Sequence, residues 1–478
     1  MAPQLNDLFI NGEWRIAHSQ RRFPVINPTT EAPIAEVVEA DAADVDAAVE
    51  AAGGAFPAWR ATPVAERARL LCALADELVR RAEDFTALIT TENGAPISES
   101  RHAAPVGATH LRLIASLGPQ AFAQDIRANP MTKGRTLVKR VPLGVAALIT
   151  PWNFPLSLIL IKLGPALMAG CTVVIKPARE TPMAARALMD AVAAAGFPRG
   201  AVNLVTGGVE TGRALVAHGA VRKVSFTGST QVGREIGEIC GRKLCAVTLE
   251  LGGKSAAIVL PDADPQTLAA NIVKVSLRNT GQTCKAATRL LVPESRAEEL
   301  TELVASVIAR APLGDPFDPQ TVFGPLAFKR QRDRVQSYIA LGRQEGARAV
   351  VGGGLESPMP QGFFVQPTLF DRVDNNMRIA REEIFGPVLC VIRYRDVEDA
   401  IRIANDSPYG LAGAVFGSDR KAALEVAEQL ETGNVGINQY GSNAAAPFSG
   451  HKDSGVGTEF GLEGLGSYLA YTSIHLDT

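Results

Sequence analysis

The sequence has few of the features that mark nucleic-acid-binding, membrane-spanning or strongly charged proteins. The formal net charge of its 478 residues is −2, so no basic excess is present to neutralise nucleic acid or an anionic membrane. Tyr (6) and Trp (3) are rare and do not alternate with basic residues, as a base-stacking surface would require. The longest apolar stretch, residues 156–175, contains Lys162 and Pro165, which favours a buried helix and strand over a membrane span.

The cysteines form no Cys-x-x-Cys pair and no closely spaced framework. They are Cys72, Cys171, Cys240, Cys245, Cys284 and Cys390. Such spacing in a long chain is typical of reduced thiols in the cytoplasm. The first residues, MAPQLNDLFINGEW, do not resemble a secretory signal because no basic segment precedes an apolar core. We therefore expect a cytoplasmic protein without a bound metal, and without nucleic-acid or membrane partners.

The apolar pattern predicts an α/β fold, and the length predicts more than one core. The runs GVAALIT, TVVIKP, AVNLVTG and KVSFTGS are typical of strands, with helices expected over 183–195 and 232–240. AVTLELGG, SAAIVL and RLLVP continue the strands, with helices expected over 265–279 and 298–311. Strands that alternate with helices indicate parallel sheets built from right-handed units. Near the N-terminus, Asn11-Gly12 predicts a hairpin turn, and Asp41 predicts a helix cap.

Cys284 ends the segment NTGQTC, in which Gly281 interrupts a helical pattern. The thiol therefore falls on an irregular segment beside polar side chains. A nucleophilic thiol needs such surroundings, because burial among apolar groups suppresses the thiolate. The alternative is that Cys284 is a small buried apolar residue, as we expect for the other five cysteines.

Glu250 is the charged residue in the run AVTLELGG and is followed by Gly252 and Gly253. A carboxylate at a strand end, beside flexible backbone, suits a general base whose pKa is raised by burial. A salt-bridged Glu at a strand end fits the same pattern. The string GGKS is not a phosphate-binding P-loop, because that motif requires glycine at the position of Thr248.

Two further candidates lie where strands end. FTGST, residues 226–230, predicts a turn and a helix start whose N–H groups suit a phosphate. Gly228 and Gly233 do not have dinucleotide-fingerprint spacing, so turn geometry alone also explains this segment. TPWNFP, residues 150–155, holds Asn153 between prolines, which suits either an oxyanion donor or a structural loop residue.

Seven segments together resemble the aldehyde dehydrogenase superfamily, over essentially the whole chain. They occur in the family's order: TPWNFP, KPARETP, FTGST, LELGGKS, NTGQTC, EEIFGPV and PFSGHKDSG. The resemblance implies a non-acylating, NAD(P)-dependent enzyme with Cys284 as the nucleophile and Glu250 as the general base. It also implies an oxyanion hole formed by Asn153 and the backbone N–H of Cys284.

The resemblance also implies positions for cofactor and substrate. Cofactor-binding positions would be Trp152, Lys176, Gly228, Ser229, Glu383 and Phe385. The substrate tunnel would be lined by Phe154, Leu158, Ile161 and Phe448, and Glu459 would lie near the water path. In the implied reaction the Cys284 thiolate attacks the aldehyde, hydride leaves for nicotinamide, and Glu250-activated water hydrolyses the thioester. Acylating relatives generally lack this glutamate, so Glu250 favours hydrolysis over transfer to coenzyme A.

The chain departs from the usual family pattern at four positions. Arg179 replaces a Glu that NAD-preferring members use on the adenosine ribose, so we expect NAD with NADP tolerated, unless Glu180 holds the arginine. Lys285 follows the nucleophile and either lowers the pKa of Cys284 or faces solvent. Thr458 replaces a frequent Arg and puts the orientation of Glu459 in question. Ser449 replaces a usual Gly without a clear consequence.

The tunnel positions favour an apolar aldehyde, whether aliphatic, aromatic or terpenoid. Semialdehyde-oxidising members resemble this chain at Arg278 but have a second Arg where this chain has Ile161, and one arginine recognises a carboxylate poorly. A polar semialdehyde substrate and a non-catalytic binding protein are the alternatives. A cysteine hydrolase would need a histidine partner, and no matching motif contains one.

The resemblance divides the chain into three parts. A Rossmann-like cofactor domain would comprise residues 1–123 and 143–249 with a return segment 446–463, and an α/β catalytic domain would comprise 250–445. Residues 124–142 and 464–478 would form a small β-extension, pairing RTLVKRVPL with YLAYTSIHL. Exposed strand edges in such an extension favour self-association into a dimer or tetramer.

Overall fold

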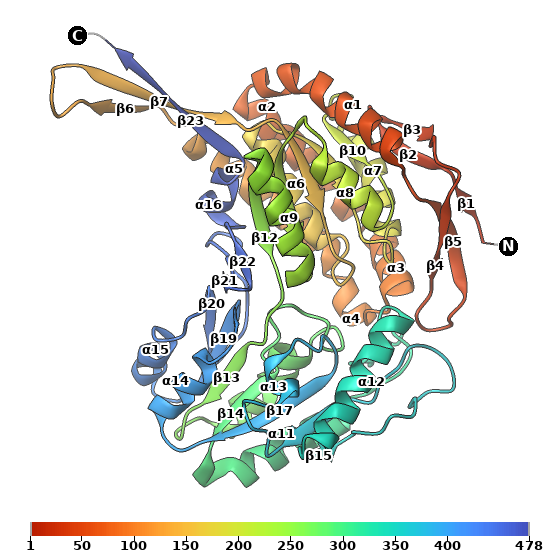
Figure 1. The fold of residues 1–478 in the computed structure, drawn as a ribbon, viewed down its shortest axis with the longest axis vertical. Coiled ribbons are helices and arrows are strands. Elements are labelled where there is room, and N and C mark those ends of the chain that lie inside the picture. Colours follow the sequence, from red (N-terminus) through yellow and green to blue (C-terminus); the bar gives the residue numbers. More distant parts are fainter. Residues whose placement is uncertain (1, 477–478) are drawn as a thin grey trace.

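The computed structural model describes residues 2–476, in which two large sheets are each covered by helices (Figure 1). The first sheet has the order β22-β12-β11-β8-β9-β10-β2-β3. Its strands are β2 (Asp7–Ile10), β3 (Glu13–Ile16), β8 (Val145–Ile149), β9 (Thr172–Lys176), β10 (Val202–Leu204), β11 (Val221–Thr227), β12 (Ala246–Glu250) and β22 (Gly455–Val456). Strands β8 to β12 are parallel to one another, as the alternating pattern predicts.

Alternate residues of this sheet supply two cores. Ala146 and Leu148 of β8 face one core, and Val145, Ala147 and Ile149 face the other. The first core contains α2 (Val64–Arg80), α5 (Ala103–Ala121), α6 (Ser157–Ala169) and α7 (Met183–Ala195). The second contains α1 (Ala42–Ala61), α8 (Val209–Ala217) and α9 (Thr230–Lys243). Burial on both faces explains why these strands are continuously apolar rather than alternating.

The second large sheet has the order β15-β16-β17-β14-β13-β19-β20 and repeats this layered plan. Its strands are β13 (Ala256–Val259), β14 (Arg289–Pro293), β15 (Arg348–Val351), β16 (Thr368–Asp371), β17 (Val388–Tyr394), β19 (Ala412–Phe416) and β20 (Asn434–Ile437). One face packs on α12 (Lys329–Gln344), α13 (Arg378–Arg381), α14 (Val397–Asn405) and α15 (Arg420–Ala427). The other packs on α10 (Pro265–Ile272), a π-helix (Val273–Leu277) and α11 (Ala297–Arg310).

The chain passes from the first sheet to the second directly after Glu250 and returns through β22. The return strand pairs with β12 through Leu249↔Val456 and Glu250↔Gly455. A separate three-stranded arm, β23-β7-β6, projects from the first half (Figure 1). It consists of β6 (Asp125–Ala128), β7 (Arg135–Pro142) and β23 (Leu469–Leu476), so RTLVKRVPL does pair with YLAYTSIHL. Residues 477–478 of the predicted extension lie outside the described residues.

Short elements connect these parts. They are β1 (Gln4–Leu5), β4 (Arg22–Ile26), β5 (Pro33–Val38), α3 (Ala82–Asn93), α4 (Ile97–Ser100), a 3-10 turn (Glu294–Arg296), β18 (Tyr409–Gly410), β21 (His451–Lys452) and α16 (Gly461–Gly466). The hairpin at Asn11-Gly12 and the Asp41 cap of α1 are both present. Within residues 2–476, no helix combines the length and apolar character that a membrane span requires.

One predicted helix was wrong at its C-terminal end. The helix predicted over 265–279 becomes a π-helix at Val273 and stops at Leu277. Asn279, Thr280 and Gly281 then adopt left-handed backbone angles, with φ of 51°, 54° and 75°. Asn tolerates this conformation, and Gly has no Cβ to strain it. The local pattern did not show that the chain must turn sharply before Cys284.

Candidate active site

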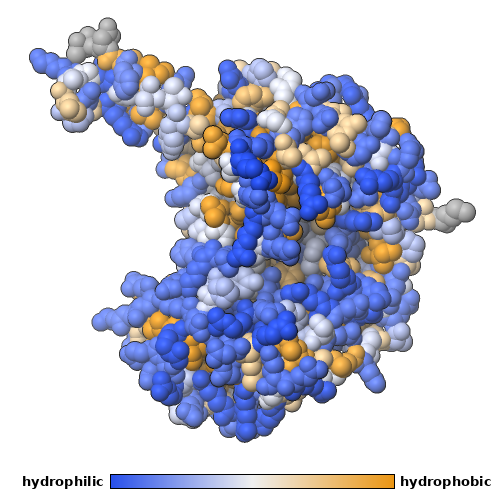
Figure 2. Space-filling view, in the orientation of Figure 1, coloured by the Kyte–Doolittle hydropathy of each residue, from blue (hydrophilic) through white to orange (hydrophobic). Residues whose placement is uncertain are grey.

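The first sheet has a point at which its strand order reverses, between β8 and β11. From β8 the chain builds β9 and β10 on one side, and then returns to build β11 and β12 on the other. In open α/β sheets such a reversal opens a crevice at the carboxyl ends of the strands, where ligands bind. Trp152 and Asn153 follow β8 at this edge, and Gly228 follows β11. Figure 2 shows a recess between the two halves of the molecule on one face.

Hydrogen bonds join the loop after β8 to the loop that carries Cys284. Asn153 Nδ2 donates to the carbonyl of Gln282 at 2.9 Å, and Asn279 Nδ2 donates to the carbonyl of Asn153 at 2.9 Å. An amide nitrogen carries two hydrogens, so Asn153 keeps one for a ligand beside Cys284. The structure thus brings together two of the residues that the sequence singled out separately.

The two glycines after Glu250 permit a close approach of backbone to the same loop. A Cβ on Gly253 would lie 2.6 Å from the carbonyl oxygen of Cys284, and a Cβ on Gly252 would lie 2.8 Å from Glu383 Oε2. Glu383 Oε1 accepts a hydrogen bond from Gly253 N at 3.0 Å. Burial raises the pKa of Glu383 to about 7. A side chain at Gly253 would clash with the Cys284 backbone, and one at Gly252 would clash with the Glu383 carboxyl group.

Glu250 ends β12 with its carboxyl group enclosed and free of hydrogen bonds. Its exposed fraction is 4%, and neither Oε1 nor Oε2 has a partner among the described residues. Burial raises the pKa of Glu250 well above its usual value, with a further contribution from the negative charge of Glu459. Glu250 is therefore not the salt-bridged residue that the sequence left open. It is a buried carboxyl group available to accept a proton.

Glu459 has the opposite environment. Its Oε1 forms a buried ion pair with Lys162 Nζ and lies 3.5 Å from Ser225 Oγ. Lys162 has a fully buried side chain on α6, and its charge lowers the pKa of Glu250. The orientation of Glu459 is thus fixed by Lys162, although Thr458 replaces the usual Arg. Sequence reasoning missed Lys162, although a lysine inside the apolar run of α6 was a signal for a buried partner.

The thiol of Cys284 is held in its neutral form. Burial raises the pKa of Cys284 to about 12, and the charges of Glu383 and Glu250 add to this increase. Lys285 lowers the pKa of Cys284, as one of the two sequence interpretations expected, but its effect is smaller than that of burial. Burial therefore favours the thiol over the thiolate at Cys284.

The expected cofactor residues cluster around the strand reversal. Ser229 caps α9, accepting from Val232 N at 3.4 Å, and Gly228 N donates to the carbonyl of Glu250 at 3.0 Å. The start of α9 therefore presents N–H groups suited to a phosphate. Lys176 ends β9 with 7% exposure, donates to the Pro177 carbonyl at 3.0 Å, and has a pKa lowered by burial to about 8.

Arg179 is exposed and lies with its guanidinium 4.9 Å from the centre of the Phe23 ring. Glu180 does not hold it, because the ion pair of Glu180 is with Arg330 at 3.9 Å. In this structure, therefore, Glu180 does not neutralise Arg179. The arginine remains free to meet an added phosphate.

Aromatic rings define one wall of this crevice. Trp152 packs edge-on against Phe385 at 5.3 Å and against Phe328 at 5.0 Å between ring centres. Sequence reasoning named Trp152 and Phe385 but missed Phe328, which precedes α12. A helix start for phosphate, a buried lysine, a buried carboxylate and an aromatic wall together fit the parts of a dinucleotide. Among residues 2–476, no three His, Cys, Asp or Glu side chains are grouped to hold a metal ion.

The expected tunnel residues share the exposed side of α6 and its preceding turn. Phe154, Leu158 and Ile161 are half-buried at helical spacing, whereas most of their neighbours on α6 are fully buried. Phe448 belongs to the return segment and packs edge-on against Phe460 at 5.9 Å. Phe460 in turn packs against His110 at 5.4 Å and was missed in the sequence. Phe154, Leu158 and Ile161 thus give this side of α6 an apolar surface.

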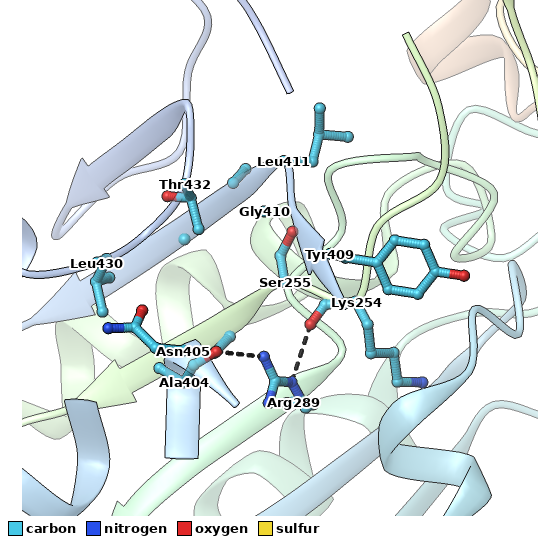
Figure 3. Close-up of a pocket in the computed structure, with 13 residues that line it drawn as sticks. Lys254, Ser255, Arg289, Ala404, Asn405, Tyr409, Gly410, Leu411, Leu430 and Thr432 are labelled. Carbon is cyan, nitrogen blue, oxygen red and sulfur yellow. Dashed lines mark hydrogen bonds between the residues drawn. The ribbon is translucent and has the colours of Figure 1, made fainter. Parts of the chain in front are cut away.

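A small cavity behind the active-site loops was also missed from sequence (Figure 3). Its volume is about 10 Å³, which admits no more than a water molecule. Arg289 lies against it and donates to the carbonyls of Lys254 at 2.9 Å and Ala404 at 2.8 Å. This guanidinium therefore fixes the chain directly after Gly252 and Gly253. Burial lowers the pKa of Lys254 to about 8, and its Nζ has no partner within residues 2–476.

Comparison with known proteins agrees with this geometry. A model of the aldehyde dehydrogenase family matches residues 14–474. Geranial dehydrogenase of Castellaniella defragrans is 44% identical over 98% of both chains. The crystal structure of an aldehyde dehydrogenase from Mycobacterium tuberculosis, complexed with NAD+, is 42% identical with a TM-score of 0.96, over 100% of this chain and 99% of that one.

A second solved structure has a ligand in addition to the cofactor. It is a mutant of aldehyde dehydrogenase C from Pseudomonas syringae, complexed with NAD+ and octanal. It is 40% identical, with a TM-score of 0.94, over 98% of this chain and 96% of that one. Family match, sequence identity and fold agree over nearly the whole length, and the chain belongs to the aldehyde dehydrogenase family.

Proposed function

We propose that the protein oxidises an aldehyde with an apolar chain to the carboxylic acid, with NAD as the hydride acceptor. The observation that carries the proposal is the buried, unpartnered carboxyl group of Glu250 beside the Cys284 loop. A buried carboxylate without a partner is costly to stability, so its presence here is best explained by chemistry. In dehydrogenases of this family, a cysteine nucleophile and a glutamate base at the positions of Cys284 and Glu250 act in the same reaction.

The proposed reaction begins at Cys284. The thiol proton first passes to a water molecule, the resulting thiolate adds to the aldehyde carbon, and the carbonyl oxygen becomes an oxyanion. The remaining Nδ2 hydrogen of Asn153 and the Cys284 backbone N–H would donate to that oxygen. Donors of this kind typically accelerate such steps by about 10²–10³-fold each.

NAD, when bound, would accept the hydride that leaves the tetrahedral carbon. The start of α9, Lys176, Glu383 and Phe385 would hold it, and Trp152 would form the wall beside it. The resulting thioester on Cys284 is then attacked by water. Glu250 takes a proton from that water, the carbon–sulfur bond breaks, and the acid is released. A carboxyl group with a raised pKa is a good acceptor near neutral pH.

We also propose that NADP is tolerated, with NAD slightly favoured, because Arg179 is exposed and unpaired with Glu180. A guanidinium can bind the extra phosphate of NADP, whereas the glutamate usual at this position would repel it. The ratio of kcat/KM for NAD to that for NADP tests this. A ratio on the order of thousands would contradict it.

The apolar side chains of Phe154, Leu158, Ile161 and Phe448 support the substrate class. Relatives named for geranial, or solved with octanal, act on or bind uncharged aldehydes, and this chain shares their fold. The test is the formation of reduced nicotinamide, followed by absorbance, across aliphatic, aromatic and terpenoid aldehydes. We expect Cys284→Ala to abolish it. No oxidation of any aldehyde would overturn the enzymatic proposal and favour a non-catalytic member of the family.

We further propose a division into domains: residues 1–123, 143–249 and 446–463 form the cofactor domain, and residues 250–445 form the catalytic domain.

We also propose that two or four copies of the chain associate through the β6–β7–β23 arm. Ile126, Tyr471, Ile474 and Leu476 are exposed on this arm, which projects into solvent in Figure 2. Apolar side chains on an unpaired edge favour pairing with another copy. A monomer in light scattering would contradict the association. The six free cysteines suit a reducing cytoplasmic setting.

A further inference from the structure

A second cavity lies beside the nucleophile, and its lining is polar. Its volume is about 230 Å³, close to the size of a small ligand site. Its walls include the side chains of Lys285, Asn434, Gln439, Ser442, Asn443 and Phe448. Phe448 is also one of the expected tunnel residues, and Lys285 directly follows Cys284 in the chain. The cavity therefore borders the chain segment that carries the nucleophile.

Lys285 is held at this cavity by contacts that leave its charge uncompensated. Its Nζ donates to Ser442 Oγ at 2.7 Å and lies 4.9 Å from the centre of the Tyr440 ring. Tyr440 OH also donates to the carbonyl of Lys285. Among residues 2–476, Lys285 takes part in no ion pair, and none of the residues lining the cavity is acidic. An ammonium group has three donors, so two remain for a ligand.

Arg278 is close by but is already neutralised. It forms an ion pair with Glu99 at 2.8 Å and lies 5.4 Å from the centre of the Phe154 ring. Burial lowers the pKa of Lys285, and the charge of Arg278 lowers it further. A negative group placed at Lys285 would relieve both effects. The cationic side chain without an acidic partner at this cavity is therefore that of Lys285, whereas Arg278 is paired with Glu99.

We propose that Lys285 recognises a carboxylate at the far end of the substrate, so that the enzyme prefers aldehydes whose apolar chain ends in a carboxylate. This inference rests on the proposed aldehyde oxidation and specifies its substrate class. The aldehyde carbon would bond to Cys284, and the carboxylate would accept from Lys285 Nζ and from the side-chain amides of Gln439 and Asn443 that line the cavity, so recognition would not depend on one cation alone. Charge-assisted hydrogen bonds of this kind are the strong ones in binding sites.

The test compares two aldehydes of equal length, adipic semialdehyde and hexanal. We expect wild-type enzyme to give the higher kcat/KM with adipic semialdehyde, and Lys285→Met to reduce the ratio of the two values by about 10- to 100-fold. Lys285→Arg keeps the charge and should keep most of the ratio. Lys421→Met is the matched control, because Lys421 is exposed on α15 and faces solvent. It should leave the ratio unchanged.

A measurement on the unaltered enzyme supports the variants. Adipate should inhibit hexanal oxidation competitively at lower concentration than hexanoate, since only adipate has a second carboxylate for Lys285. Equal inhibition by both acids would overturn the inference, as would a Lys285→Met variant whose ratio equals that of wild type. In either case hexanal is still oxidised, so the proposed dehydrogenase activity stands. Failure to oxidise either aldehyde would instead contradict the proposed function.

Discussion

Glu250 and Glu459 are both buried carboxyl groups at the junction of β12 with the return segment, yet their surroundings differ. Glu459 is paired with Lys162 and lies near Ser225, whereas Glu250 has no partner in the described structure. Two like charges close together cannot both be stabilised without a cation, and Lys162 forms its ion pair with Glu459 rather than with Glu250. The ion pair with Lys162 fixes the position of the Glu459 carboxylate, whereas the unpaired carboxyl group of Glu250 remains available for proton transfer.

The largest expected effect comes from removing the free carboxyl group. Glu250→Gln keeps the size of the side chain but removes its ability to accept a proton from water. We expect steady-state turnover to fall by about 10²–10⁴-fold, the usual contribution of a general base. Rapid-mixing measurements should still show one burst of reduced nicotinamide, because the thioester forms and then accumulates. Loss of the burst together with turnover would show that Glu250 acts before hydrolysis.

The next effect tests the paired carboxyl group. Lys162→Met should destabilise the protein by about 3–5 kcal/mol, because it removes the cation that is in contact with the buried Glu459 carboxylate. Urea unfolding measures this. The double variant Lys162→Met with Glu459→Gln should recover much of the loss, because no charge is then left unpaired. By contrast, Glu250→Gln should not lower stability, and a loss as large as that of Lys162→Met would contradict the distinction between the two carboxyl groups.

The same contrast explains what could be predicted from the sequence. Glu250 and Cys284 were found because each interrupts a local pattern: a charge in a strand and a polar segment after a helix. Their neighbourhood could not be found in this way. Lys162 and Glu459 are 297 positions apart and meet only because α6 and the return segment pack together.

The fold was predicted with similar limits. Alternation of strands and helices identified the parallel strands, and the pairing of β7 with β23 followed from the family resemblance. The sharp turn at Asn279–Gly281 did not follow from local pattern, because it is set by hydrogen bonds to Asn153 and by close packing of backbone. Phe328, Phe460 and Arg289 were missed for the same reason: each acts through contacts distant in sequence.

A smaller effect concerns the pH dependence of turnover. Glu250 must be ionised to accept a proton, so activity rises as pH increases through its pKa. The charge of Glu459 raises that pKa, and the charge of Lys162 lowers it. Glu459→Gln should therefore move the acid limb of the profile to lower pH, and Lys162→Met should move it to higher pH. Shifts in the same direction would contradict the assignment of the limb to Glu250.

The smallest expected effect comes from Ser225→Ala. The hydroxyl lies 3.5 Å from Glu459 Oε1, at the outer limit of a hydrogen bond, and the ion pair with Lys162 remains when it is removed. We expect a change in unfolding free energy of about 1 kcal/mol or less and no change in the burst or in turnover. A turnover loss comparable to that of Glu250→Gln would mean that Ser225 positions Glu459 against Glu250. The two carboxyl groups would then act as one unit rather than as a fixed group beside a free one.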